Sequence, residues 1–306
     1  MSDIKLFRIK AMPVVQLTGK SVKFEKSLQN LIEKHLDVFL GIRFLVSEYS
    51  TGKKHGGRID TMGIDENGCP CIIEYKRTSD ENVISQGLYY LDWLLDHKAE
   101  FEMLVIKKYG QPVADNIEWS SPRLLCIAGD YTKYDIHAVQ QINRNIELIR
   151  YINFEDEFLL LELVNGVQST GPVSVTTSSS IGKVGVKYDK TVDEHLKDAS
   201  SQLLELFDAF KETCLSFGED VQIKPLKLYV AFKRLKNFAT VEVRSGVGVL
   251  ACYVKLNPDS IELEKGFTRD VREISHWGSG DLEITIKTQA DLDKALPMLR
   301  ASYENA

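Results

Sequence analysis

The chain has 306 residues, of which 43% are hydrophobic, and a formal net charge of −6. This length predicts two domains of ordinary size, each with enough apolar residues to form a core. The negative charge excludes a globally basic nucleic-acid binder, so any binding of phosphate requires a local basic patch and a metal ion that screens the acidic residues.

The cysteines and the hydropathy of the chain indicate in which cellular compartment the protein is expected. The five cysteines show no zinc-ligand spacing, and Cys69 and Cys71 are too close in sequence for a relaxed disulfide. Reduced thiols in the cytoplasm are the simplest interpretation. The N-terminal residues lack the apolar core of a signal peptide. The longest apolar stretch, 158–164, is interrupted by Glu162 and is too short to cross a bilayer. We therefore expect a cytoplasmic protein without a membrane partner.

The first predicted elements are strands and a helix. Residues 4–17 alternate loosely, as strands do. Apolar residues with a 3.6-residue period predict a helix over 22–40, with Gly41 as its C′ glycine. Helical geometry places Glu25 about 50° from the centre of the apolar stripe and Glu33 about 130° away. Glu33 is therefore expected to be solvated, whereas Glu25 either faces the sheet or lies at its rim with its carboxylate in water.

A strand and a basic loop come next. Residues 42–49 have the pattern of the first core strand, and residues 50–58 form a flexible basic loop that leads into the following strand. Lys53, Lys54 and Arg58 of this loop either contact backbone phosphates or are simply solvated.

The stretch from Gly57 to Arg77 predicts a β-hairpin, because apolar runs flank an Asn-Gly pair. Asp60 lies on its first strand. Glu74 and Lys76 lie two residues apart on its second strand, so their side chains share one face. A regular two-residue loop would turn Asp60 away from them. For the three side chains to converge, the loop must contain an odd number of residues or a bulge must intervene, and we predict one of these.

Two carboxylates and an amine at the wide end of a hairpin suit a hard divalent cation beside a phosphate. Asp60 and Glu74 supply the oxygen ligands that such a cation prefers, and Lys76 can hold or polarise an attacking water. The alternative interpretation is a solvated, charged face of the hairpin.

One long helix, or two, is predicted over 80–109 after a helix start at 78–81. Gln86 and Tyr90 lie one turn apart on this helix. The run 123–128 is continuously apolar, which is typical of a buried strand. A helix and two strands then follow, at 135–145, 146–152 and 157–163.

The composition changes over residues 165–190, where Gly, Ser and Thr predict a flexible linker. A smaller α+β domain is predicted over 191–306. Its closing helix is capped by Thr288, and Pro297 should bend or interrupt that helix. The other predicted elements of this domain are a helix at 192–217 and strands at 226–232, 238–243, 249–256 and 282–286.

Asp60 followed by Glu74-Tyr75-Lys76 resembles the D…ExK signature of the restriction-endonuclease-like superfamily, the PD-(D/E)XK nucleases. Ile59 replaces the proline of that family. Gln86 and Tyr90 resemble the Q-x-x-x-Y element of its RecB-like branch. The resemblance covers about residues 20–163. It implies an α/β fold, a mixed sheet flanked by helices, in a nuclease domain at 1–164.

The resemblance also implies a function, a metal-dependent nuclease that hydrolyses phosphodiester bonds, with DNA as the favoured substrate. Asp60 and Glu74 would bind Mg²⁺ or Mn²⁺ and Lys76 would orient the water. Glu25 would be the acid of the first helix, and Gln86 would approach the active site. The residues expected to contact nucleic acid are Lys53, Lys54, Arg58, Arg77 and Tyr90.

Residues 227–239 and 276–284 resemble a C-terminal domain family of unknown function that often accompanies nuclease-like domains. In it, His276 and Trp277 are expected to anchor a turn. Two other functions remain open: a catalytically silent fold that binds nucleic acid or a protein, and a chain in which the second domain is the main actor as an interaction or regulatory module. A homodimer is also left open.

Overall fold

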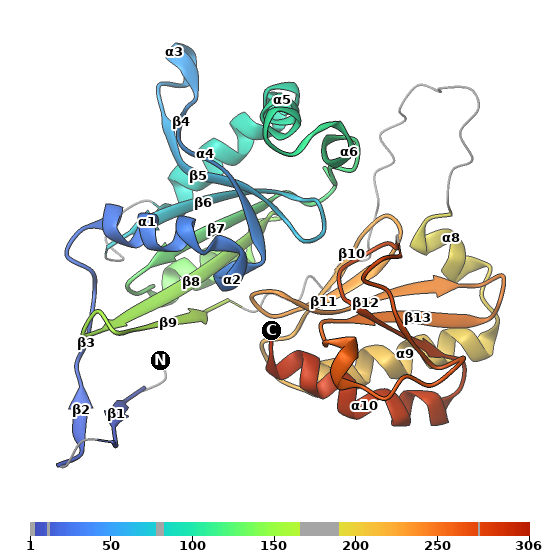
Figure 1. Cartoon of the computed structure of the whole chain (residues 1–306). Coiled ribbons are helices and arrows are strands. Elements are labelled where there is room, and N and C mark those ends of the chain that lie inside the picture. The colour runs from blue at the N-terminus through green and yellow to red at the C-terminus, as the bar shows by residue number, and fades with distance from the viewer. Residues whose placement is uncertain (1–3, 11–12, 78–82, 166–189, 275) are drawn as a thin grey trace. The chain divides into compact units, whose positions relative to one another are not determined.

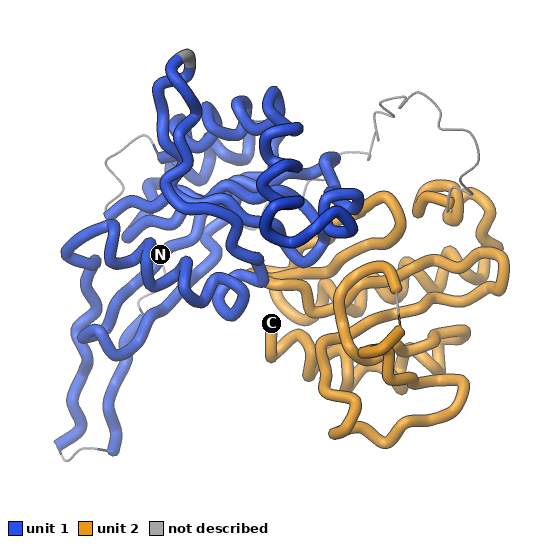
Figure 2. The backbone as a smooth tube through the Cα atoms, turned by 45° about the horizontal axis from the view of Figure 1, so that its top comes forward, with its two compact units in different colours: residues 1–165 blue, residues 166–306 orange. Residues whose placement is uncertain are grey.

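The structure, a computed structural model, describes residues 4–10, 13–77, 83–165, 190–274 and 276–306 (Figure 1). The chain divides into two compact units, residues 1–165 and 166–306 (Figure 2). The predicted helix start at 78–81 and all but the two ends of the predicted linker lie outside the described residues. Within the described part of the chain, no helix combines the length and the apolar character needed to cross a membrane.

The first unit is built on a seven-stranded mixed sheet in the order β3-β8-β7-β6-β5-β4, with β9 paired to β8. Strands β6, β7 and β8 run parallel, and the other neighbours are antiparallel. The strands are β3 (Gly19–Lys20), β4 (Ile42–Ser50), β5 (Arg58–Asp65), β6 (Pro70–Lys76), β7 (Arg123–Ala128), β8 (Asn145–Phe154) and β9 (Phe158–Leu163), and β1 (Leu6–Arg8) and β2 (Val15–Leu17) pair separately.

The helices of this unit are α1 (Glu25–Lys34), α2 (Leu36–Leu40), α3 (Gly52–His55), α4 (Val83–Asp96), α5 (Lys98–Tyr109), α6 (Gln111–Ala114) and α7 (Lys133–Gln140). The helix predicted over 22–40 is divided at His35, and the one predicted over 80–109 is divided at His97. Gly41 ends α2 with φ +63°, as predicted for a C′ glycine.

Helices α1 and α4 cover opposite faces of the sheet. Met62 of β5 belongs to the apolar core that contains Leu91 of α4, whereas its neighbour Thr61 donates a hydrogen bond of 2.6 Å to Glu33 of α1. Because successive side chains of a strand alternate between faces, the two helices lie on opposite sides. The fold class expected from the sequence, a mixed sheet flanked by helices, is confirmed, and Asp60 shares the α4 face with Met62.

The β5–β6 hairpin has the odd loop that the convergence of the acids requires. Asp65 N donates to Cys69 O at 2.9 Å, which leaves a loop of the three residues 66–68. The Asp65 carboxylate accepts hydrogen bonds from Asn67 N (2.9 Å) and Cys69 N (2.8 Å) and so shapes the turn. Gly68 adopts φ +76°, where a side chain would be strained. The prediction that the hairpin has either an odd loop or a bulge is confirmed by the odd loop.

A buried ion-pair network holds this closed end of the hairpin in place. Arg123 donates to Asp65 Oδ2 at 3.0 Å and to both oxygens of Glu147 at 2.8 Å, and the three side chains are at most 3% exposed. Bidentate geometry and full pairing offset the cost of burying these charges. The opposite end of the same two strands carries Asp60 and Glu74.

The second unit is a six-stranded antiparallel sheet in the order β10-β11-β12-β13-β15-β14, with helices packed on it. Its elements are α8 (Val192–Lys197), α9 (Ser201–Leu215), β10 (Gln222–Pro225), β11 (Val230–Lys233), β12 (Asn237–Arg244), β13 (Val249–Val254), η1 (Pro258–Ser260), β14 (Thr268–Asp270), β15 (Leu282–Ile286) and α10 (Gln289–Glu304). This is the smaller α+β fold that was expected.

Three details of the second unit differ from the prediction. The helix predicted over 192–217 is divided into α8 and α9. Strands β10 and β14 were not predicted, because each is short and carries no apolar alternation. Helix α10 continues past Pro297 without interruption, and its N-terminus is closed by the predicted Thr288 cap, whose hydroxyl accepts a hydrogen bond from Asp291 N at 3.2 Å.

Candidate active site

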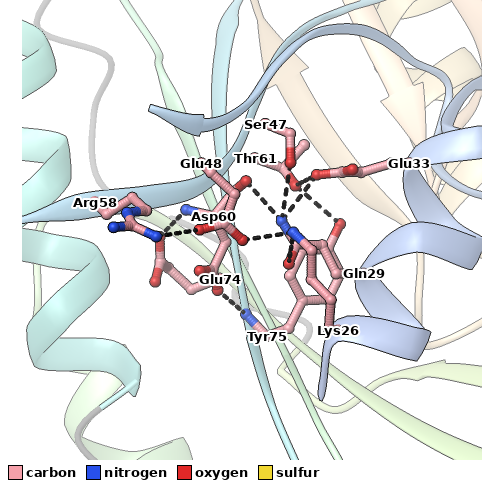
Figure 3. Close-up of polar contacts among 10 residues, drawn as sticks. All are labelled: Lys26, Gln29, Glu33, Ser47, Glu48, Arg58, Asp60, Thr61, Glu74 and Tyr75. Atoms are coloured by element: carbon pink, nitrogen blue, oxygen red, sulfur yellow. Dashed lines mark hydrogen bonds and ion pairs between the residues drawn. The ribbon is translucent and has the colours of Figure 1, made fainter. Parts of the chain in front are cut away.

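The register of the hairpin places Asp60 and Glu74 side by side. Thr61 pairs with Ile73, so Asp60 and Glu74 are the next residues in register. There the backbone ladder ends and side chains replace it (Figure 3). Asp60 N donates to Glu74 Oε1 at 3.2 Å, and Tyr75 N donates to Asp60 Oδ2 at 3.0 Å. Each carboxylate is therefore fixed by the main chain of the opposite strand.

Glu74 is a buried acid with an unsatisfied oxygen. Its side chain is 0% exposed, and no residue in the described ranges forms a hydrogen bond with its Oε2. Burial, followed by the charge of Asp60, raises the pKa of Glu74 to about 9. Burial also raises the pKa of Asp60, which is partly exposed. Two adjacent carboxylates in a poorly solvated position are costly unless a cation neutralises them.

The two acids fit a hard divalent cation. Mg²⁺ prefers oxygen ligands, retains several waters and is usually held by one or two carboxylates. Across the described residues, no group of three or more His, Cys, Asp or Glu side chains is placed to hold a metal. A cation here would therefore be bound by Asp60 and Glu74 together with water, and Glu74 Oε2 offers an oxygen that has no other partner among the described residues.

Lys76 completes the predicted set on this face. It follows Glu74 by two residues on β6, so both side chains leave the strand on the same side. Its positive charge opposes the burial-driven rise in the pKa of both Asp60 and Glu74. The structure thus brings together the three residues of the D…ExK pattern.

Glu25, the first residue of α1, also lies at this end of the sheet. Its Oε1 accepts a hydrogen bond of 3.0 Å from Arg77 N, directly after β6, and its negative charge contributes to the raised pKa of Asp60. Glu25 is partly buried. Of the two positions left open for it, the one facing the sheet near the acids agrees with this contact.

Sequence reasoning missed a third acid, Glu48, which forms with Asp60 and Glu74 a row of carboxylates across three neighbouring strands, here called the acid row. Ser47 pairs with Thr61, so Glu48 lies opposite Asp60 on the adjacent strand β4. Its φ of +53° is in the left-handed region, which is uncommon for residues other than glycine and clusters at functional sites. The signal in the sequence is weak, because apolar residues occupy both parities of β4 and its register shifts between Phe44 and Val46.

Glu48 connects the acid row to α1 and to the start of β5 (Figure 3). It forms ion pairs with Lys26 at 2.6 Å and with Arg58 at 3.4 Å, and the hydrogen bond from Lys26 lowers its pKa. Lys26 also donates to Gln29 Oε1 at 3.0 Å, and Gln29 Nε2 donates to Asp60 O at 2.9 Å. The buried Gln29 therefore positions the backbone of Asp60.

The expectation that Glu33 is solvated is wrong. Glu33 Oε1 accepts hydrogen bonds from Thr61 Oγ1 at 2.6 Å and from Gln29 Nε2 at 3.0 Å. The position of Glu33 on the helix, far from its apolar stripe, predicted exposure to water. It did not predict this contact, because a polar side chain of the sheet, Thr61, faces α1.

Gln86 and Tyr90 support the site indirectly. Gln86 Nε2 donates to Tyr90 OH at 3.1 Å, and the same hydroxyl accepts a hydrogen bond from Arg58 N at 3.1 Å. In the contacts of the described residues, Gln86 bonds to neither carboxylate. Tyr90 is only 5% exposed, so the expected contact of Tyr90 with nucleic acid requires correction. Tyr90 instead anchors the start of β5.

The remaining predicted contacts to nucleic acid are exposed basic residues around this end of the sheet: Lys53, Arg58 and Arg77. Lys54 lies in α3, and its side chain is outside the described part of the structure. An exposed aromatic neighbour, Tyr89, donates from its hydroxyl to His55 O at 3.0 Å, and its ring centroid lies 5.6 Å from that of His55.

Comparison with known proteins finds similarity in the C-terminal part of the chain and along its whole length. Residues 192–306 match a domain of unknown function, DUF5655, in agreement with the expected C-terminal family. The whole chain is similar to an uncharacterised protein of Haemophilus influenzae, with 28% identity over 307 residues that cover 99% of this chain and 100% of that protein.

Two solved structures are similar to part of the chain. One is a repair endonuclease from Pyrococcus abyssi, with 22% identity, a TM-score of 0.28 and coverage of 45% of this chain and 51% of that one. The other is an EndoMS-dsDNA2 complex, with 18% identity, a TM-score of 0.25 and coverage of 41% and 44%. The chain thus spans about half the length of each.

Proposed function

We propose that the first unit is a divalent-cation-dependent nuclease of the PD-(D/E)XK superfamily, of its RecB-like branch, that hydrolyses phosphodiester bonds in DNA. The observation that carries this proposal is the pairing of Asp60 with the buried Glu74 at the parted ends of β5 and β6, with Glu74 Oε2 left without a hydrogen-bond partner among the described residues. Two fixed carboxylates and a lysine on one face are what this chemistry requires.

Each residue has a separate task in this proposal. Asp60 and Glu74 would hold Mg²⁺ or Mn²⁺, which when bound would neutralise charge on the phosphate. Lys76 would orient the attacking water and stabilise its deprotonated form. Glu48 and Gln29 would position Asp60, the first across the strand pair and the second through the hydrogen bond to Asp60 O. Arg58, whose side chain is 68% exposed, would contact a substrate phosphate.

A cleavage assay tests the proposal. Labelled single-stranded, duplex and branched DNA, and RNA of the same sequence, would be incubated with the full-length protein and Mn²⁺ or Mg²⁺. We expect cleavage of DNA that falls at least about 100-fold in Asp60→Asn, Glu74→Gln and Lys76→Ala, because each variant removes a group that stabilises charge in the transition state. Asp96→Asn, an exposed acid at the end of α4, is the matched control and should cleave normally.

Binding measured in EDTA separates the alternatives. A variant that binds DNA with unchanged affinity but does not cleave it supports the assigned roles. Binding of DNA by the wild-type protein without cleavage under any metal condition would instead indicate a catalytically silent nucleic-acid-binding module. Absence of both would refute the proposal for the first unit and favour a function that resides in the second.

A further inference from the structure

The second unit exposes an unusual polar face on its sheet. Val241 and Val243 of β12 point into the apolar core beneath α9 and α10, so the alternate residues Glu242 and Arg244 point to the opposite face. Tyr253 of β13 shares that face, since it pairs with Thr240, two residues before Glu242 on β12. Tyr253 also pairs with Glu283 of β15, whose partner on β14 is Arg269. A row of charged and aromatic side chains thus crosses four strands on the side away from the core.

A pocket of about 320 Å³ lies on this face, and it is lined by Glu242, Arg244, Tyr253, Arg269, His276 and Trp277. This volume is at the lower end of the range of roughly 300–1,000 Å³ that ligand sites occupy. A small planar molecule would fit this volume, whereas a folded peptide segment would not.

The polar groups of the pocket are held in a fixed arrangement. Arg244 donates to Glu242 Oε2 through Nε (3.0 Å) and Nη2 (2.8 Å), and its Nη2 also donates to Tyr253 OH at 2.7 Å. Arg269 Nη2 donates to Glu283 at 2.6 Å. Among contacts of the described residues, Arg244 Nη1 and Arg269 Nε have no acceptor, so donors remain for a ligand beside the carboxylate of Glu242.

Two further rings form the wall of the pocket. The His276 ring stacks on Tyr253 with centroids 4.4 Å apart and an interplanar angle of 20°. His276 Nδ1 lies 2.9 Å from Ile274 O, and since a carbonyl only accepts, this nitrogen carries the proton. Trp277 N donates to Glu242 Oε1 at 3.3 Å, while 42% of the residue remains exposed. His276 thus contacts its own loop, as expected of a residue that anchors a turn. Trp277 was expected to act in the same way, but much of it remains exposed and available to a ligand.

The loop that carries Trp277 is pressed against the sheet. Gly278 has φ +93°, and a Cβ at this position would lie 2.3 Å from Thr240 Oγ1. Thr240 Oγ1 donates to Ser279 O at 3.3 Å, and Asn237 Nδ2 donates to Ser279 Oγ at 3.0 Å. An exposed indole on a loop fixed in this way is pre-organised, so a ligand that stacks on it does not have to order the loop.

The charges decide what kind of ligand fits. The two arginines and the two glutamates of this face sum to no net charge, so neither a bare phosphate nor a simple cation gains net attraction. The pocket does offer donors from Arg244 and Arg269, an acceptor from Glu242, and aromatic surface. Unpaired nucleobases are recognised through this combination of stacking and hydrogen bonds along the base edge.

We propose that this pocket of the second unit binds a single unstacked nucleobase, which stacks on Trp277 and hydrogen-bonds through its edge to Arg244 and Glu242. The base comes either from a free nucleotide or from an unpaired position in a strand, because both present the same edge. The site requires no metal and none of the residues of the first unit, so it stands or falls independently of the proposed nuclease activity.

Calorimetric titration of the full-length protein in EDTA tests this inference. The probes are the four deoxynucleoside monophosphates, a short single-stranded oligonucleotide, the same strand with abasic sites, and inorganic phosphate. We expect saturable binding of a nucleotide or of the intact strand that weakens about tenfold in Trp277→Ala and less in Trp277→Phe, which retains a ring. Tyr134→Ala, which removes another exposed ring, is the matched control and should bind normally.

The probes separate the two sources of the base and the ways in which the inference fails. Binding of a monophosphate identifies a free nucleotide as sufficient, and binding of the strand alone identifies an unpaired base in a chain. Equal binding of the abasic strand, competition by inorganic phosphate, or unchanged affinity in Trp277→Ala would each overturn nucleobase recognition, as would absence of binding by every probe.

Discussion

The pH dependence of stability is the sharpest test of the environment assigned to Glu74. In the folded chain its pKa is raised from 4.5 to about 9, with burial as the main cause and the charge of Asp60 next. Between these values the folded state binds a proton that the unfolded state has released. Glu74 therefore contributes stability that is complete below pH 4.5 and is lost progressively as the pH rises toward 9.

The size of the effect follows from the slope of the free energy of unfolding against pH. One proton corresponds to about 1.36 kcal/mol for each pH unit, so raising the pH from 5.5 to 7.5 should cost the first unit about 2.7 kcal/mol through Glu74 alone. For a unit of this size, that corresponds to a fall of roughly 5–10 °C in its melting temperature. Glu74→Gln keeps the shape of the side chain and removes its titration, so the melting temperature of this variant should not show this fall between pH 5.5 and 7.5.

Calorimetry of the full-length protein in EDTA at several pH values measures this difference, with the transition of the second unit as an internal reference. Glu33→Gln is the matched control, because it neutralises a nearby carboxylate that accepts hydrogen bonds from Thr61 and Gln29. Adding Mg²⁺ should stabilise the wild type more at pH 7.5 than at pH 5.5, since a cation competes with the proton. Parallel pH profiles for the wild type and Glu74→Gln would refute the reasoning.

Three further substitutions probe the support of the site. Glu48→Gly should reduce cleavage by more than tenfold, because the ion pairs of Glu48 are lost. It should change the free energy of unfolding by less than about 1 kcal/mol, because glycine accepts the positive φ and exposed ion pairs contribute little. A loss of stability well above about 1 kcal/mol that accompanies the loss of cleavage would contradict this. Tyr90→Phe should destabilise the first unit by about 1–2 kcal/mol in urea unfolding, since Arg58 N loses its acceptor. Gly68→Ala should cost at least about 1–2 kcal/mol, because φ is +76° and Asn116 O would lie 2.7 Å from the new Cβ; an unchanged melting temperature would show that the turn can relax.

Much of the hairpin was predictable because its determinants are local. The Asn-Gly turn, the alternation of the strands and the spacing of Glu74 and Lys76 all act within twenty residues. For the three side chains to converge, strand parity required an odd loop or a bulge, and the structure has three residues in the loop. What the sequence could not indicate was the cause, the Asp65 carboxylate, which depends on Arg123 from a distant strand.

The site residues that the sequence did not reveal, Glu48 and Gln29, are placed by contacts between distant parts of the chain. Glu48 reaches the acid row only because β4 pairs with β5 in a register that shifts at a bulge between Phe44 and Val46. Gln29 is important because a helix packs across that same strand pair. Both positions follow from long-range pairing, which leaves only a weak trace in the pattern of apolar residues. The burial of Tyr90 was likewise set by packing between α4 and the sheet.

Buried carboxylates lie at both ends of the β5–β6 strand pair, but in the described part of the chain only those at one end are neutralised by an arginine. At the closed end, Arg123 neutralises Asp65 and Glu147 with hydrogen bonds of 2.8–3.0 Å, and these acids stay paired inside the fold. At the parted end, the charge of Lys76 only partly offsets burial, and the pKa of Glu74 remains at about 9. A fold selected only for stability would place an arginine or an apolar residue there. Under the proposed function, a cation from solution would compensate this acid, and the same argument would apply to a DNA and to an RNA substrate.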